Sequence, residues 1–273
     1  SVVGQTMLDS RDVNAISFTG SVETGGKVAM ACASRGAKFQ LEMGGKNPLV
    51  VLDDANLDLA VAAALDGAFY QTGQRCTASS RLIVQAKVHD AFVERMVEGM
   101  KKLKVDNALA DGTVIGPVVD EAQMAQDERY IQIARDEGGQ LAWGGERLNR
   151  DTKGFYLSPA LFVGTKNDMR INREEVFGPV ASVIKVDSYD EALSVANDTA
   201  FGLSSGIITT SLKYATDFRK KSAAGMVMVN LATAGVDYHV PFGGRKGSSY
   251  GAREQGRHAV DFYTAIKTAY TLA

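Results

Sequence analysis

The sequence is poor in the residues that build disulfide frameworks and metal sites. Its two cysteines, Cys32 and Cys76, allow at most one bridge, and the three histidines, His89, His239 and His258, lack the spacing of metal ligands. No charged segment followed by an apolar one stands at the start of the chain. We therefore predict no metal site and a reducing, cytoplasmic setting.

Long apolar runs and an excess of one charge are also missing. The longest unbroken apolar run, residues 59–65, falls far short of the ~18–20 residues that span a bilayer. Thirty Lys and Arg against 32 Asp and Glu give a formal net charge of −2, which leaves no global field to attract nucleic acid or an acidic membrane. We predict neither nucleic acid nor membrane as a partner.

Glycine, in contrast, is abundant, with 28 residues of 273 against only 5 prolines. Many backbone positions must therefore adopt a positive φ or let another group approach closely. The chain also opens at Ser1 rather than at a methionine. We interpret it as a piece of a longer chain.

Short strand-like runs alternate with helix-like segments along the sequence. Apolar and β-branched runs predict strands at residues 15–18, 39–41, 48–52, 81–85, 161–163, 180–186, 206–210 and 226–230. Apolar residues at helical spacing, with capping residues such as Asn56, Asp120 and Ser188, predict helices between most of these strands. This alternation indicates an α/β fold with a mainly parallel sheet.

Cys76 is the first candidate for chemistry. It follows Gly73-Gln74-Arg75 in a polar segment that can begin a helix, and amides at a helix N-terminus favour the thiolate. A cysteine is more often a small buried apolar residue. Cys32, among Val28, Ala29 and Met30 on a predicted helix, fits that description, whereas Cys76 does not.

A second candidate is Glu42, which ends an apolar run and precedes Met43-Gly44-Gly45. A carboxylate beside two residues without side chains leaves room for substrate or water and suits a general base, although a glutamate at a surface turn reads equally well. Thr19-Gly20-Ser21 with Gly25 forms a strand-to-helix turn whose amides can cradle a phosphate.

Two further loops combine glycine with charged or aromatic residues. Glu174 and Glu175 precede Val176-Phe177-Gly178-Pro179, and most such acidic pairs are solvated loop residues. Pro241-Phe242-Gly243-Gly244-Arg245-Lys246 is either a flexible connection or a phosphate clamp, and it lacks the spacing of a Walker loop.

Taken in order, five segments resemble the motifs of the aldehyde dehydrogenase superfamily. They are Phe18-Thr19-Gly20-Ser21, Leu41-Glu42-Met43-Gly44-Gly45-Lys46-Asn47-Pro48, Gly73-Gln74-Arg75-Cys76, Glu175-Val176-Phe177-Gly178-Pro179 and Pro241-Phe242-Gly243-Gly244. The resemblance covers essentially all 273 residues but corresponds to roughly the C-terminal half of a typical family chain. The Arg75-Cys76 setting and the ending Tyr250-Gly251-Ala252-Arg253-Glu254-Gln255-Gly256 look most like bacterial α-ketoglutaric semialdehyde dehydrogenases.

The resemblance implies NAD(P)-dependent oxidation of an aldehyde to a carboxylic acid. Cys76 matches the nucleophile that forms a thiohemiacetal and then a thioester, its amide matches one oxyanion donor, and Glu42, 34 residues earlier, matches the base that activates water. Ser21 matches a pyrophosphate contact, Gly44 a backbone approach near the nicotinamide, and Glu175 and Phe177 the carboxylate and aromatic ring beside the nicotinamide ribose. The choice between NAD and NADP rests on a βα unit that these residues do not include.

Substrate and partner expectations follow from the same resemblance. The substrate is expected to be a small aldehyde, and Arg75, next to the nucleophile, is the cation available to an acidic semialdehyde unless it pairs with a surface acid instead. Phe242 is expected at the substrate as well. The strand-like residues 262–270 predict a homodimer or homotetramer, because an exposed edge of that kind needs a partner.

We expect a remnant of a Rossmann-like nucleotide-binding domain at residues 1–43, a catalytic α/β domain at 44–244 and an oligomerisation tail at 245–273, with the 273-residue piece alone inactive. Two alternatives remain. One is a CoA-acylating relative, which would not need Glu42 as a base for water. The other is a non-catalytic structural or interaction protein that keeps the fold.

Overall fold

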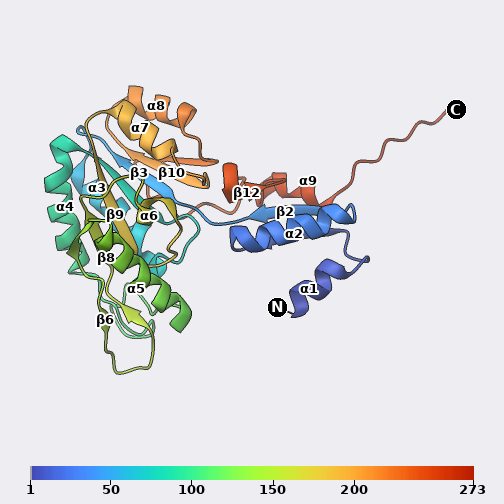
Figure 1. The fold of residues 1–273 in the computed structure, drawn as a ribbon. Coiled ribbons are helices and arrows are strands. Elements are labelled where there is room, and N and C mark those ends of the chain that lie inside the picture. The colour runs from blue at the N-terminus through green and yellow to red at the C-terminus, as the bar shows by residue number, and fades with distance from the viewer. Residues whose placement is uncertain (1) are drawn as a thin grey trace.

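The computed structural model describes residues 2–273 and contains two main sheets that lie side by side (Figure 1). The larger sheet has seven strands in the order β11-β10-β3-β4-β9-β8-β5. Its strands are β3 (Asn47–Val51), β4 (Ser79–Gln85), β5 (Gln140–Trp143), β8 (Ala160–Val163), β9 (Val180–Val186), β10 (Ser204–Ile208) and β11 (Met226–Val229). All neighbouring pairs are parallel except β5 with β8 at one edge, so the prediction of a mainly parallel α/β sheet is confirmed.

Helices cover both faces of this sheet, as the alternation of strands and helices predicts. They are α3 (Leu57–Phe69), α4 (Ala86–Met100), α5 (Glu121–Asp136), α6 (Arg170–Arg173), α7 (Tyr189–Asn197) and α8 (Leu212–Lys221), with a 3-10 turn, η1 (Tyr70–Gly73), after α3. The predicted caps are confirmed, since the side chains of Asn56, Asp120 and Ser188 accept backbone hydrogen bonds at the starts of α3, α5 and α7.

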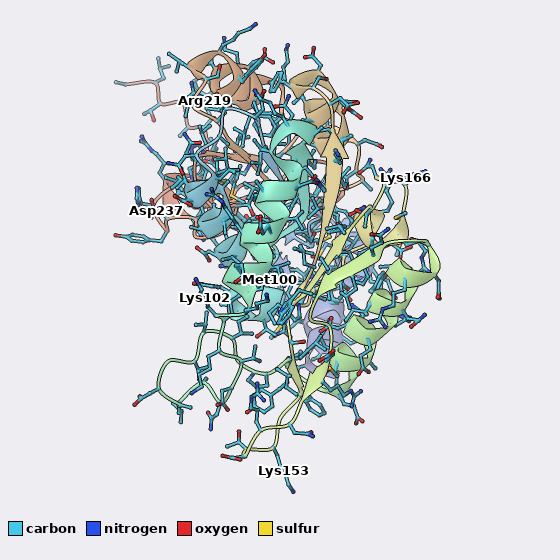
Figure 2. All side chains as sticks on the ribbon, turned by 90° about the vertical axis from the view of Figure 1, so that its left-hand side faces the viewer. Met100, Lys102, Lys153, Lys166, Arg219 and Asp237 are labelled. Atoms are coloured by element: carbon cyan, nitrogen blue, oxygen red, sulfur yellow. The ribbon has the colours of Figure 1, made fainter. Side chains whose placement is uncertain are left out.

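The buried strand β3 shows how the two faces are filled. Leu49 and Val51 pack with α3 and α4 on one face, whereas Val50 and Leu52 pack with α7 and α8 on the other. The period of two along a strand gives this division, and burial on both faces explains why residues 48–52 are apolar without alternation. Figure 2 looks onto the side of α4, whose Met100 is buried, while Lys102 and Lys153 lie on loops at the edge of the molecule.

The smaller sheet joins strands from the N-terminal and C-terminal parts of the chain. Strands β1 (Ala15–Thr19) and β2 (Lys38–Glu42) run parallel, and β12 (Ser249–Tyr250) adds to β2 in the antiparallel sense. Helix α2 (Val22–Ser34) packs on this sheet, and α1 (Val2–Asp9) packs on α2. The short hairpin β6 (Arg147–Leu148) and β7 (Tyr156–Leu157) stands apart from both main sheets.

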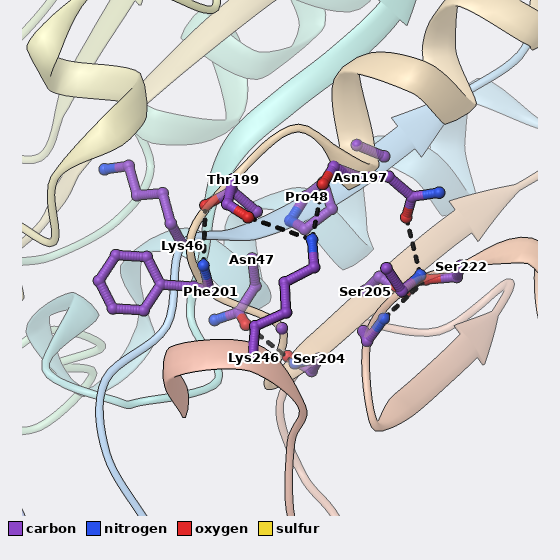
Figure 3. Close-up of a pocket in the computed structure, with 14 residues that line it drawn as sticks. Lys46, Asn47, Pro48, Asn197, Thr199, Phe201, Ser204, Ser205, Ser222 and Lys246 are labelled. Atoms are coloured by element: carbon purple, nitrogen blue, oxygen red, sulfur yellow. Dashed lines mark hydrogen bonds between the residues drawn. The ribbon is translucent and has the colours of Figure 1, made fainter. Parts of the chain in front are cut away.

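Polar contacts fix the segments that enter and leave the larger sheet (Figure 3). The Asn47 side chain accepts a hydrogen bond from the Ser204 amide at 3.0 Å and donates to the carbonyl oxygens of Cys76 at 2.8 Å and Ala78 at 2.9 Å. Lys246 donates to the carbonyl oxygen of Asn197 at 2.7 Å. The chain therefore enters and leaves the larger sheet through fixed polar contacts rather than a loose linker.

The prediction of a strand over residues 262–270 is wrong for this chain by itself. Helix α9 (Ala259–Tyr263), which follows the 3-10 turns η2 (Lys246–Ser248) and η3 (Gly256–His258), includes the first two of these residues. Residues 264–273 extend away from the body without regular structure (Figure 1). A strand needs a neighbour for its backbone groups, and the described part of this chain offers none to the tail. In residues 2–273 no helix is long and apolar enough to cross a membrane.

Candidate active site

A cleft of about 760 Å³ opens where the two sheets meet. Its lining comes from the ends of β1 and β2, the segment between α3 and β4, helix α5 and the loop before β9. The parallel register of β1 and β2 pairs Thr19 with Glu42, so both strands deliver their carboxyl ends to the same edge. Such an edge is where ligands bind in open α/β sheets.

Most of the residues that the sequence singled out share this cleft. Nine of the predicted site residues line it: Thr19, Gly20, Ser21, Glu42, Gly44, Arg75, Cys76, Glu175 and Phe177. Gly25 and Phe242 do not line it. The candidate nucleophile, the candidate base and the candidate cofactor carboxylate are thus in one cavity although they come from segments far apart in the sequence.

Cys76 lies in a turn before β4 rather than at a helix start, and the expectation of a lowered pKa is wrong. Burial and the charges of Glu175 and Glu42 raise the pKa of the Cys76 thiol, and the amides of Cys76 and Thr77 lower it by less. Three residues with positive φ, Gln71 to Gly73, precede the turn. The resting site therefore favours the neutral thiol.

Cys32 has the setting expected for an apolar residue. It is fully buried in α2 and packs in the cluster between α2 and the small sheet. Burial raises the pKa of its thiol. The two thiols are free, and only Cys76 reaches the cleft.

Glu42 ends β2 with its side chain buried and hydrogen-bonded. The hydroxyl of Ser249, its register partner on β12, donates to Glu42 Oε2 at 2.6 Å. Burial raises the pKa of Glu42 to about 7, the Ser249 bond opposes this, and the charges of Glu254 and Arg253 act in opposite senses. A carboxylate with a pKa near neutrality is well placed to accept a proton from water.

Glu175 lies against the segment that follows Glu42 and depends on two glycines. The amide of Gly45 donates to Glu175 Oε1 at 2.9 Å. A Cβ added at Gly44 would lie 1.9 Å from Glu175 Oε2, so no other residue fits there without displacing the carboxylate. Burial raises the pKa of Glu175, and Lys46 and the Gly45 amide lower it.

The turn between β1 and α2 presents the start of a 13-residue helix to the cleft. The Ser21 side chain caps this helix by accepting a hydrogen bond from Thr24 N at 3.2 Å. Free amides at this end favour an anion. Gly25, which we expected at the phosphate, lies inside the helix instead, where an added Cβ would meet Met43 Sδ at 2.3 Å, and its role is close packing of α2 on the small sheet.

The two predicted substrate residues have other partners. The Arg75 guanidinium donates to the carbonyl oxygens of Asp66 and Gly67 at the end of α3 and approaches the Asp66 carboxylate at 3.4 Å. Arg75 therefore binds the end of α3 and an acid, which is the alternative to substrate binding that the sequence analysis left open. Phe242 exchanges backbone hydrogen bonds with Glu254 and is not in the cleft.

Several lining residues escaped the sequence analysis. Gln123 and Gln126 enter the cleft from α5, where they read as ordinary surface positions of an amphipathic helix. Ser249 reaches Glu42 from 207 residues further along the chain. The helical pattern of α5 does not show which of its polar residues face a cleft. A serine in a glycine-rich segment likewise does not show which distant residue it contacts.

The geometry defines an α/β protein with a half-buried cysteine and a buried acid facing one cleft, and sequence comparison gives its family. The profile of the aldehyde dehydrogenase family matches residues 1–269, and the chain belongs to that family.

Individual members of the family can be aligned with almost the whole chain. The chain is 44% identical over 272 residues to α-ketoglutaric semialdehyde dehydrogenase of Bacillus subtilis, covering 99% of this chain and 56% of the relative. It is 41% identical to betaine aldehyde dehydrogenase of Mesorhizobium japonicum, covering 98% of this chain and 55% of the relative. The chain thus spans about half the length of these relatives.

Solved structures confirm the fold. Betaine aldehyde dehydrogenase from Staphylococcus aureus in complex with NAD+ superposes with a TM-score of 0.92 at 34% identity, over 95% of this chain and 52% of that one. Aldehyde dehydrogenase from Bacillus cereus gives 0.93 at 34% identity, over 97% and 53%. The arrangement of two sheets around the cleft is therefore that of the family.

Proposed function

We propose that the chain is the catalytic part of an NAD(P)-dependent aldehyde dehydrogenase that oxidises a small aldehyde to a carboxylic acid. The observation that carries the proposal is that Cys76, Glu42 and Glu175 line one cleft, in a chain of this family. A nucleophile, a base and a carboxylate for a cofactor hydroxyl are the groups that this reaction requires.

The first step is covalent capture of the aldehyde. Cys76 loses its proton to water, and the sulfur adds to the aldehyde carbon, forming a C–S bond and placing the carbonyl electron pair on oxygen. The amide of Cys76 faces this region and stabilises the developing negative charge. The product is a thiohemiacetal bound to Cys76.

Oxidation then needs an acceptor for hydride. A bound nicotinamide would supply the acceptor for the hydride that leaves the same carbon, and that carbon would then be held on Cys76 as a thioester. The residues present fit this half of the cofactor, because Gly20 leaves backbone exposed at the cleft, and Glu175, lodged against Gly44, offers a fixed carboxylate for a ribose hydroxyl. Phe177, 38% exposed, lies beside that carboxylate.

Hydrolysis of the thioester is assigned to Glu42. Its carboxylate removes a proton from water as the water oxygen adds to the thioester carbon, and collapse breaks the C–S bond and releases the acid and the Cys76 thiol. A buried carboxylate with a pKa near 7 favours this hydrolytic route over transfer of the acyl group to a thiol such as CoA.

The substrate class is a further part of the proposal. A substrate of the α-ketoglutaric semialdehyde type is supported by the resemblance to the Bacillus subtilis relative, and since Arg75 is engaged elsewhere, any cation for its carboxylate must come from another residue. Comparison of kcat/KM for α-ketoglutaric semialdehyde and betaine aldehyde separates the two groups of relatives.

We also propose a reducing, cytoplasmic setting, because a free Cys76 is needed, and a homo-oligomer that covers the exposed tail. The side chains of Ile266, Tyr270 and Leu272 are at least 95% exposed. Packing against a second copy of the chain would bury these apolar surfaces. Sedimentation of the full-length protein as a monomer alone at micromolar concentration would refute the oligomer.

The experiment for the main proposal is a matched pair of cysteine variants in the full-length protein. Cys76→Ser should abolish aldehyde-dependent reduction of NAD(P) and labelling by a thiol reagent, whereas Cys32→Ser should leave both close to wild type. Turnover near wild type in Cys76→Ser would remove the nucleophile. No turnover in the wild type with any aldehyde would favour a non-catalytic protein.

A further inference from the structure

The loop before β9 that carries Glu175 and Phe177 has an unfavourable backbone. Phe177 has a φ of 60°, in the left-handed region that large side chains rarely adopt. Such a conformation persists only when the surrounding contacts hold it. The contacts that hold this loop therefore decide where both side chains stand in the cleft.

Helix α5 supplies the hydrogen bonds to the middle of the loop. Gln123 Nε2 and Gln126 Nε2 each donate to the carbonyl oxygen of Val176 at 2.9 Å. On the next residue but one, Gly178 is enclosed from two sides: a Cβ added at Gly178 would lie 2.0 Å from Asp127 Oδ1, and one added at Gly73 would lie 2.2 Å from the Gly178 carbonyl oxygen. The loop is thus clamped between α5 and the turn before Cys76.

Asp127 is the unusual member of this clamp. It is fully buried, Oδ1 accepts one hydrogen bond of 2.9 Å from Gln123 Nε2, and Oδ2 has no partner. No basic side chain in residues 2–273 forms an ion pair with it within 4 Å. A buried acid without a cation lowers stability, so its presence calls for a compensating role.

That role is visible in the Gln123 amide. One amide nitrogen donates both to Asp127 and to Val176, so an acceptor at position 127 fixes which way the amide is turned. With an apolar residue there, the Gln123 amide would keep the Val176 carbonyl as its acceptor but would lose the second acceptor that holds its side chain in place. Asp127 therefore acts on the loop twice, through Gln123 and through its contact with Gly178.

We propose that Asp127 is a positioning residue for the cofactor side of the cleft, which holds Glu175 and Phe177 in place by orienting Gln123 and supporting Gly178. The inference rests on the proposed function, because it assigns the loop to the nicotinamide end of the cofactor. It assigns Asp127 no contact with substrate or cofactor, and Asp127 does not line the cleft.

Three variants test this in the full-length protein. Asp127→Leu keeps the branched shape of the side chain and removes the acceptor, whereas Asp127→Asn keeps an oxygen that can accept from Gln123. The matched control is Asp136→Leu, because Asp136 accepts from Gln132 at the same spacing of four residues on the exposed side of the same helix.

We expect Asp127→Leu to raise KM for NAD(P) about ten-fold with a smaller change in kcat, since displacement of about 1 Å at a site has effects of that order or larger. Hydrogen exchange of the amides of residues 175–178 should accelerate by a similar factor. Asp127→Asn and Asp136→Leu should stay within three-fold of wild type in both measurements. If Asp127→Leu does not fold, Gln123→Met breaks the same bond at a partly exposed position.

Unchanged cofactor KM and unchanged loop exchange in Asp127→Leu, or in Gln123→Met if that variant replaces it, would overturn the proposal. Equal defects in the leucine and asparagine variants would do so as well, because the bond to Gln123 would not matter. If the wild type shows no NAD(P)-dependent oxidation, the proposed function fails, and the exchange measurement still decides whether Asp127 holds the loop.

Discussion

Ser249 donates a hydrogen bond of 2.6 Å to Glu42 across 207 residues of sequence, and in the same turn its oxygen accepts a hydrogen bond from Gly244 N at 2.6 Å. The bond to Glu42 lowers the pKa of a carboxyl that burial raises to about 7. Ser249→Ala should therefore raise the pKa of Glu42 further, by about one to two units, since bonds to charged groups contribute ~1.5–3 kcal/mol. The acid limb of the kcat–pH profile for thioester hydrolysis should move to higher pH.

The neighbouring serine provides the control for this prediction. Ser248 Oγ accepts from Gly202 N at 3.0 Å and does not touch Glu42. Ser248→Ala should lower stability without moving the profile. A profile that is identical in Ser249→Ala and wild type would show that the titrating group is not Glu42.

The carboxylates around Cys76 should slow its reaction with alkylating reagents. Glu175 and Glu42 both raise the pKa of the thiol, so neutralising either one increases the thiolate fraction. Glu175→Gln and Glu42→Gln should each accelerate alkylation of Cys76 by iodoacetamide roughly three- to ten-fold at pH 7.5. Mass spectrometry of the Cys76 peptide over time measures the rate.

Glu174→Gln is the matched control, because the Glu174 carboxylate accepts from Arg170 and Tyr130 rather than facing the thiol. Its alkylation rate should equal that of the wild type. A slower reaction in Glu42→Gln would mean that Glu42 takes the proton from Cys76 itself, contrary to the electrostatic account.

Two adjacent glycines of α2 should respond oppositely to alanine. An added methyl at Gly25 would meet Met43 Sδ at 2.3 Å, whereas nothing lies within 4 Å of one at Gly26. Gly25→Ala should lower the free energy of unfolding by ~1–3 kcal/mol through overpacking, and Gly26→Ala should raise it by ~0.4–1 kcal/mol. Urea denaturation of the two variants compares them directly, and equal effects would contradict the packing role given to Gly25.

Asp127 should make the stability of the protein depend on pH. Burial raises its pKa to about 7 from 3.8, with the Gln123 bond acting against this and the charge of Glu128 adding to it. The folded state therefore retains a proton that the unfolded state releases, so stability falls as the pH rises through this interval.

Between pH 5 and pH 8, the wild type should lose roughly 2–3 kcal/mol more than Asp127→Asn, which has no carboxyl to titrate. Glu42 contributes a loss in the same direction but is present in both proteins. Denaturation at the two pH values gives the difference. Parallel losses in the two proteins would mean that Asp127 is ionised throughout.

Local patterns in the sequence predicted six of the seven strands of the larger sheet, most of its helices and their caps, because these depend on periods of two and 3.6 and on neighbouring residues, but they missed β5. They also placed Cys76 and Glu42 at the ends of elements, which the fold then brought to one cleft. The state of the site was not predictable in this way. The raised pKa of Cys76 and the commitment of Arg75 to the end of α3 depend on burial and on partners that only tertiary packing supplies.

The tail shows the same limit. Aromatic and β-branched residues at 262–270 favour a strand, but residues 264–270 pair with no strand of the described chain. Asp127 illustrates the converse, since nothing in an amphipathic helix distinguishes a buried acid under Gly178 from a surface acid such as Asp136. The local sequence gives a segment's preferred conformation, and long-range contacts determine the conformation that it adopts.

The most direct test of the central claim is mass spectrometry of Glu42→Gln in the full-length protein after mixing with NAD(P) and an aldehyde that the wild type oxidises. If Cys76 is the nucleophile and Glu42 the base for hydrolysis, about one equivalent of reduced cofactor should form in a burst, and an acyl group should remain on the Cys76 peptide. Wild-type protein should show steady turnover with little acyl group retained. Undiminished turnover in Glu42→Gln, or an acyl group found on Cys32, would contradict the account.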